Sequence, residues 1–169
     1  KEIRIGEIKT NGNSYPLLIP FFKNAGFYWD LNKTNAPKVY AAIQNVVLRI
    51  VMSLPKRHVK VRIIDEDFGS SFQMLLGLPE EVIGNSVYYD DKEVLRLFDE
   101  LKKRDSDIIF NKLKNSYSNL IEHNKTKDFD FEPIELFVIN KFPQNFNNQF
   151  VKYISNQIDK GCKTGVYYL

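Results

Sequence analysis

Three consecutive acidic residues, Asp65-Glu66-Asp67, form the first group in this sequence whose types could do chemistry. They follow the apolar run 59–64, and carboxylates at the end of a strand can hold a hard cation such as Mg²⁺. No fourth ligand is recognisable nearby, and such a cluster is more often a solvated turn. We therefore expect no metal site here.

The two histidines and the single cysteine offer little for catalysis. Neither His58 nor His123 has a partner four residues away that would make a metal-binding pair on a helix, so we expect both at the surface. Cys162 lies beside Lys163, which could lower the pKa of its thiol, but no histidine is near in sequence to activate it as a nucleophile. We expect Cys162 in a turn.

An aromatic cluster near one lysine could instead bind single-stranded nucleic acid, because bases stack on such rings. The rings close to Lys23 in sequence are Phe21, Phe22, Phe27, Tyr28 and Trp29. Burial in the core of a sheet explains most of them more simply. We therefore rank nucleic-acid contact by this segment below assembly with other protein modules.

Apolar periodicity places these residues on alternating strands and helices. We expect extended segments around a turn at Asn11-Gly12-Asn13, a short strand at 27–31, and a helix from Pro37 capped by Thr34 or Asn35. Further along the chain, the pattern predicts strands at 59–64, 87–89, 134–139 and 166–169, a long helix from Asp90 or Asp91 through Leu113, and helices at 118–123 and 146–158, the last ended by Gly161.

This order predicts an α/β fold with one mostly parallel sheet, helices on both of its faces and an N-terminal extended hairpin. The nearly unbroken apolar run 134–139 is typical of a central strand that is buried on both faces. Ligands in such folds bind at the carboxyl ends of the strands. Any site is therefore expected at 32–37, 65–69 and 140–143.

Composition narrows the class of protein. The 169 residues suit one domain, and 43% hydrophobic with 14% aromatic residues excludes a disordered tail. Because no apolar run approaches the roughly 18 to 20 residues of a membrane span, we expect no membrane contact. One cysteine fits a reducing compartment, so we expect a cytoplasmic protein. The net charge of +3 comes from interspersed residues, unlike the one-sided basic excess of a strong nucleic-acid binder.

Several strings, in their order and spacing, resemble the ATPase domain of FtsK/SpoIIIE-type DNA translocases, in the HerA–FtsK superfamily of P-loop NTPases. They are the helical string 45–55, the strand end 61–65 with Gly69-Ser70-Ser71-Phe72, the segment Ile121-Glu122-His123-Asn124, and 161–166, which is similar to a G-x-x-x-G-V leading into a strand. The resemblance spans nearly the whole chain. It implies a three-layer, RecA-like fold, with residues 1–169 forming a single FtsK-like domain of a longer chain.

The sequence departs from this family at the phosphate loop, G-x-x-x-x-G-K-[ST]. Lys33-Thr34 match the final pair, but Phe27 and Asn32 stand at the two glycine positions. A Cβ at each position obstructs the backbone dihedrals and the close approach to phosphate that the loop needs. We expect the region Asn32, Lys33 and Thr34 to be a degenerate phosphate loop.

A second departure lies at the strand ends. The resemblance assigns Asp65 to the family's first strand-end acid, where it is expected to orient the following loop. After 137–139, where the family places acidic residues that hold magnesium, this chain has Asn140 and Lys141. An amide and a cation there cannot bind magnesium as carboxylates do. We therefore expect no catalytic residue, no metal and no cofactor in this segment.

The resemblance thus implies an inactive copy of the ATPase module, serving as a structural or regulatory part of a larger DNA-translocating ATPase. The active modules of the full-length protein would use ATP and Mg²⁺, its partners would be neighbouring ATPase modules or subunits, and DNA would be bound through the full assembly. Two alternatives remain open. One is a degenerate module of a type VII secretion-like motor, which moves protein, and the other is a stand-alone binding module that uses the 65–72 loop.

Overall fold

The computed structural model describes residues 2–24, 26–84, 87–127, 130–144, 146–158 and 160–169. In chain order its strands are β1 (Ile3–Thr10), β2 (Asn13–Ile19), β3 (Val59–Ile64), β4 (Val87–Tyr88), β5 (Ile134–Ile139) and β6 (Val166–Tyr168). Its α-helices are α1 (Ala36–Ser53), α2 (Gln73–Leu76), α3 (Glu80–Ile83), α4 (Asp91–Asp107), α5 (Leu120–Lys125), α6 (Asn148–Ile158) and α7 (Gly161–Thr164). Short 3₁₀ turns at Phe21–Lys23 and Ser70–Phe72 and a π-helical turn at Ile108–Leu113 complete the described elements.

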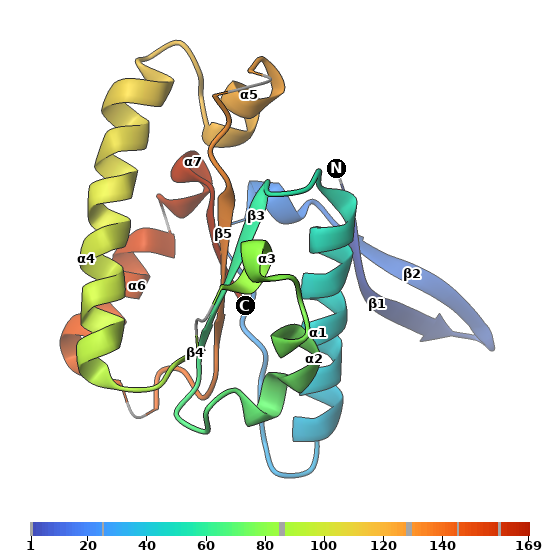
Figure 1. Cartoon of the computed structure of the whole chain (residues 1–169). Coiled ribbons are helices and arrows are strands. Elements are labelled where there is room, and N and C mark those ends of the chain that lie inside the picture. Colours follow the sequence, from blue (N-terminus) through green and yellow to red (C-terminus); the bar gives the residue numbers. More distant parts are fainter. Residues whose placement is uncertain (1, 25, 85–86, 128–129, 145, 159) are drawn as a thin grey trace.

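A four-stranded parallel sheet, in the order β4-β3-β5-β6, forms the centre of the molecule (Figure 1). The helix α1 covers one face, while α4 and α6 cover the other, as right-handed parallel connections require. The hairpin β1–β2 lies beyond α1 and projects away from the sheet. The α/β fold, the parallel sheet covered on both faces and the N-terminal hairpin are all confirmed.

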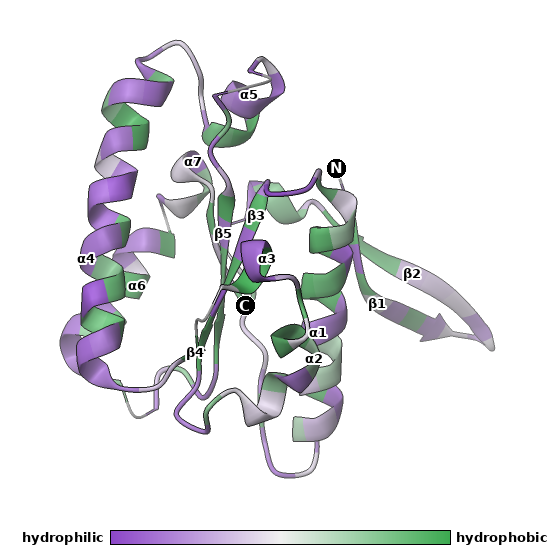
Figure 2. Ribbon diagram, in the orientation of Figure 1, coloured by the Kyte–Doolittle hydropathy of each residue, from purple (hydrophilic) through white to green (hydrophobic). Residues whose placement is uncertain are grey.

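The strands divide their side chains between two hydrophobic cores with a period of two residues. In β5, Leu136 and Val138 join the core under α1, whereas Phe137 joins the core under α4 and α6. In β6, Tyr167 joins the core under α1, and Tyr168 joins the core under α4 and α6. Figure 2 shows largely hydrophobic strands beside an α4 that is hydrophilic over most of its length. The prediction that 134–139 is the central strand is confirmed, because β5 pairs with strands on both sides.

The expected strand at 27–31 is wrong. Only Gly26 touches the sheet, through a single parallel bridge to Tyr168 at the edge beyond β6, and Phe27 N–H donates to the Tyr168 carbonyl (2.9 Å). The two backbones approach so closely that a Cβ on Gly26 would lie 2.5 Å from that carbonyl oxygen. The chain then leaves the sheet, so the aromatic side chains that follow are free to line other surfaces.

The long helix predicted from Asp90 or Asp91 through Leu113 is confirmed in its extent. Asp90 caps α4 by accepting from Glu93 N–H (2.8 Å), and the helix continues past Asp107 as a π-helical turn to Leu113. Gly161 does not end α6, which ends at Ile158, but begins α7, and the position needs a glycine because a Cβ there would meet the Val166 carbonyl at 2.7 Å.

Candidate functional site

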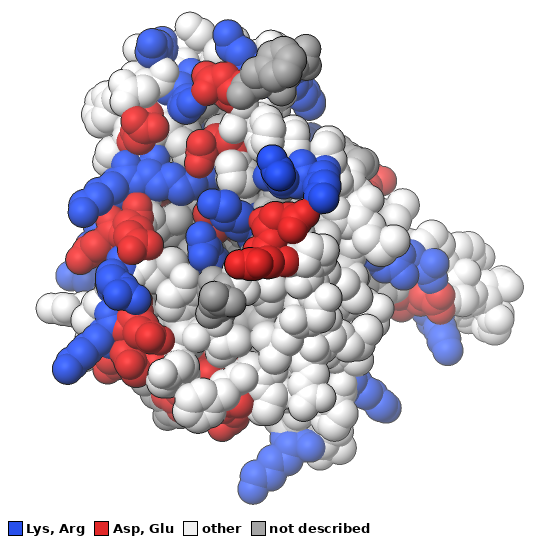
Figure 3. All heavy atoms as spheres, viewed as in Figure 1, with Lys and Arg blue, Asp and Glu red and all other residues white. Residues whose placement is uncertain are grey.

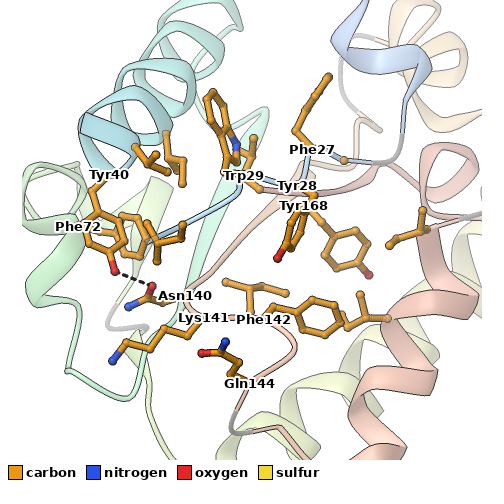
Figure 4. Close-up of a pocket in the computed structure, with 18 residues that line it drawn as sticks. Phe27, Tyr28, Trp29, Tyr40, Phe72, Asn140, Lys141, Phe142, Gln144 and Tyr168 are labelled. Carbon is orange, nitrogen blue, oxygen red and sulfur yellow. Dashed lines mark hydrogen bonds between the residues drawn. The ribbon is translucent and has the colours of Figure 1, made fainter. Parts of the chain in front are cut away.

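The carboxyl ends of β3 and β5 are joined by a direct hydrogen bond between the two predicted strand-end residues. Asn140 Nδ2 donates to Asp65 Oδ1 at 2.9 Å, and both side chains are buried. Tyr40 of α1 donates its hydroxyl to Asn140 Oδ1 (3.1 Å; Figure 4). This network fixes α1 over the strand ends. Because Asp65 is only 1% exposed, the expectation of a fully solvated acidic turn is wrong for this residue.

Lys141 turns away from Asn140 and pairs with Asp67. Its Nζ donates to Asp67 Oδ2 at 2.7 Å, and this hydrogen bond raises the pKa of the Lys141 ammonium. The residue has a positive φ of 57°, which is costly for a side chain with a Cβ and directs Lys141 away from the aromatic residues in Figure 4. The protonated Lys141 therefore neutralises one carboxylate of the acidic turn, that of Asp67.

The predicted phosphate-loop residues form a closed turn in front of α1. Asn32 Oδ1 accepts the N–H groups of Thr34 (2.9 Å) and Asn35 (3.0 Å), and Asn35 Oδ1 accepts the N–H of Asn32 (2.8 Å). The N–H of Ala36 donates to the Asn32 carbonyl (3.0 Å). Asn35 is the residue before α1, as expected, but its side chain caps no N–H of the helix, because it is used within this turn.

A cavity of about 360 Å³ opens beside the segment 26–31 and the end of β5 (Figure 4). Its walls come from the segment 26–31, from α1, from the ends of β5 and β6, and from α6. At this edge the described part of the chain adds only the Gly26 bridge to the sheet, and side chains of both α1 and α6 line the cavity there. The side chains that define the walls are Tyr28, Trp29, Phe72, Phe142, Tyr168 and Ile158.

Asp65, Asn140 and Lys141 therefore lie at one place, with Lys141 linked to the others through Asp67 on the β3 turn. In the described part of the chain, no hydrogen bond or ion pair joins Asn32, Lys33 or Thr34 to these strand-end side chains. The two predicted halves of the site sit at the same edge of the sheet but are not connected.

No protein-family profile matches the sequence, and no curated protein matches it. Solved structures do match over 99% of the chain: EssC (ATPases 2 and 3) from Geobacillus thermodenitrificans, with a TM-score of 0.77 at 13% identity, and the cytoplasmic domain of EssC, with 0.69 at 15%. The pCW3 conjugation coupling protein TcpA, in its monomer form with ATPγS, matches with 0.64 at 14%.

The chain shares its fold with parts of EssC and TcpA. It spans 32% of each EssC chain and 46% of the TcpA chain, so those proteins carry further domains. At these identities the likeness establishes the fold alone.

The nucleotide and magnesium that the sequence's resemblance to FtsK/SpoIIIE-type ATPases implies do not fit the residues present. Phosphate would need free backbone N–H groups before α1, but those of Asn32, Thr34 and Asn35 already have acceptors. Magnesium would need carboxylates at the end of β5, where Asn140 and Lys141 stand. Within the described residues, no three His, Cys, Asp or Glu side chains converge on a possible metal position.

The remaining candidates are mostly structural. His123 is 2% exposed and lies edge-on to Tyr117, so its predicted surface position is wrong, while His58 is half-buried and stacks on Phe131 at 4.0 Å. Cys162 lies in α7, and burial raises the pKa of its thiol, opposite to the effect expected from Lys163.

The aromatic residues near Lys23 have different surroundings. Phe21 is fully buried, and Phe22, Phe27 and Trp29 pack against the same core. Tyr28 is 75% exposed. The prediction that burial accounts for most of these rings is confirmed, although they pack beside the sheet rather than within a strand.

Sequence reasoning missed the cavity and two of the residues that shape it. Tyr40 lies three residues before Ile43 and seven before Val47, so it shares the apolar stripe of α1, and that pattern gives no signal for the bond of its hydroxyl to Asn140. Phe72 was noted only as part of a turn, yet its ring packs edge-on against Tyr40 at 5.4 Å. Neither the apolar stripe of α1 nor the turn that contains Phe72 indicates that a cavity lies beside Gly26.

Proposed function

We propose that this chain is a non-catalytic FtsK/SpoIIIE-type module that serves as a structural or regulatory part of a larger translocating ATPase. The closed turn at 32–35 carries the proposal. In a P-loop protein the backbone N–H groups of this segment cradle phosphates. Here the side chains of Asn32 and Asn35 occupy those donors, so binding a triphosphate would first require three hydrogen bonds to break.

The strand ends support the same proposal. A catalytic site needs acidic groups that hold magnesium and polarise water. Among the residues that the structure describes, the only acid bonded to Asn140 is the buried Asp65, and the neighbouring Asp67 is neutralised by Lys141. The turn that would bind phosphate and the strand ends that would bind magnesium are therefore both occupied by internal contacts. These contacts stabilise the fold and not a ligand.

For the cargo of the larger assembly, we propose protein rather than DNA. The two EssC matches have higher TM-scores than TcpA, and EssC belongs to the type VII secretion class. The charges add a physical argument, because Lys and Arg side chains alternate with Asp and Glu over the face formed by α4 (Figure 3). A DNA-tracking surface would concentrate positive charge instead.

In this proposal the module acts beside active modules that bind ATP and Mg²⁺ and that lie outside this segment. Its partners are those neighbouring modules or subunits, in the cytoplasm. Among the described residues, no helix is long and apolar enough to cross a membrane. The EssC structure with ATPases 2 and 3 shows that such modules occur together in one chain.

The test is nucleotide binding by the purified chain, measured by isothermal titration calorimetry with ATP and magnesium, together with phosphate release. We expect no saturable heat and no activity above background. Lys33→Ala should behave as the parent protein does, and so should the matched control Lys38→Ala, which changes an exposed lysine within α1. Magnesium-dependent hydrolysis that Lys33→Ala abolishes and Lys38→Ala retains would show that the proposal is wrong.

A further inference from the structure

The cavity beside Gly26 has the features of a ligand site, and not merely those of a packing gap. Its volume of about 360 Å³ falls in the range of roughly 300–1,000 Å³ that small-molecule sites occupy. Apolar walls with a few polar groups on one side are the usual composition of such sites. Here the polar groups are Asn140, Lys141 and Gln144, which lie together along one side of the cavity in Figure 4.

The charges at this cavity favour a neutral ligand. Of the described residues that line it, Lys141 alone is charged, and its ammonium is already paired with Asp67 at 2.7 Å. An anion such as a phosphate would compete with this ion pair, and a cation would find no acid on the walls. The uncharged polar groups present, amides and phenol hydroxyls, can bond a neutral molecule without a buried charge.

The backbone at the cavity does not favour an extended peptide. A peptide strand gains affinity from unpaired main-chain donors and acceptors along an edge. The N–H groups of Phe27, Ile139, Asn140 and Leu169 all donate to neighbouring carbonyls of the sheet. Along these strand ends recognition comes from side chains, and the rings of Tyr28, Trp29 and Phe142 also line the cavity.

From this we propose that the cavity binds a neutral, ring-containing apolar small molecule. The inference rests on the proposed function, because a module that binds no nucleotide leaves this cavity available to another ligand. Trp29 lies in the wall and is the only tryptophan of the chain, so its fluorescence reports on this site alone.

The test uses N-phenyl-1-naphthylamine, a neutral aromatic fluorescent probe, titrated into the purified chain while energy transfer from Trp29 is recorded. We expect saturable binding with energy transfer. Ile158→Asp places a charge on the α6 wall at a position that is 44% exposed, and it should weaken binding at least tenfold. The matched control Ile109→Asp changes a 38% exposed isoleucine that does not line the cavity, and should change binding less than twofold.

A second variant keeps the proposal testable if Ile158→Asp fails to fold. Tyr28→Ser removes an exposed ring from the wall with little effect on the core, and we expect it to weaken binding about fivefold. Binding that neither variant weakens would overturn the pocket while leaving the proposed function standing. Displacement of the probe by ATP would overturn both, because the cavity would then accept a nucleotide.

Discussion

At the scale of single residues, Asn140 explains why the strand end holds no acid. Its amide donates to Asp65 and accepts from Tyr40, so it satisfies two neighbours of opposite hydrogen-bonding character. An aspartate can accept from Tyr40 but cannot donate to Asp65 when ionised. The residue that removes magnesium chemistry from this position also links β3, β5 and α1.

We predict that Asn140→Asp destabilises the fold by about 2–3 kcal/mol at neutral pH, because two carboxylates then meet in a buried contact. The pKa of the introduced carboxyl will be raised by burial and by Asp65. A raised folded-state pKa means that stability returns as the pH falls and the pair takes up a proton. Urea unfolding at pH 7 and pH 4.5 measures both effects.

The control for this prediction is Asn45→Asp, which makes the same change at an exposed position on α1. It should alter the unfolding free energy by less than about 0.5 kcal/mol at either pH. A loss at Asn140→Asp that stayed constant between the two pH values would contradict the paired-carboxylate explanation.

At the scale of elements, periodicity predicted most of the fold because each strand and each long helix has a clear apolar pattern. The run 134–139 became β5 and the stripe after Asp90 became α4. The prediction of a strand at 27–31 was wrong because it rested on the strand propensity of the aromatic residues alone. A strand also needs a partner strand along its length. Only Gly26 finds one, and propensity cannot show where a sheet ends.

The candidate site was predicted only in part, for a related reason. Asp65 and Asn140 were located correctly, since the carboxyl ends of parallel strands share one edge of the sheet. The contacts of Lys141 with Asp67 and of Tyr40 with Asn140 join residues 74 and 100 positions apart. No local pattern specifies such pairs, because they depend on how α1 and the two strand-end turns pack.

The turn before α1 makes a prediction at this scale. Asn32→Ala removes the acceptor for two backbone N–H groups and should destabilise the chain by about 1 kcal/mol, as the loss of a capping side chain does. Thr34→Ala is the control, since the Thr34 hydroxyl makes no hydrogen bond within the described residues. Thermal unfolding measures both, and equal effects of the two variants would argue that the asparagine does not close the turn.

At the scale of the whole molecule, the distribution of charge separates the two cargo classes. The chain holds 24 basic and 21 acidic residues, and several of the cations are committed within the fold. Arg62 pairs with Glu135 at 3.0 Å, Lys56 with Glu81 at 2.9 Å, and Lys141 with Asp67. On the face formed by α4, the remaining Lys and Arg side chains are interspersed with Asp and Glu, so this face offers no continuous track of positive charge for phosphates.

We therefore predict that the chain shows no saturable binding to duplex DNA at micromolar protein in about 150 mM salt, since non-specific affinity depends on the number of phosphates neutralised. Fluorescence anisotropy of a labelled duplex, repeated at about 50 mM salt, measures this. Weak binding at the lower salt that disappears at the higher is expected from a net charge of +3. Sub-micromolar binding that survives at 150 mM salt would instead favour a DNA-translocating assembly, because only a concentrated basic surface retains affinity under that screening.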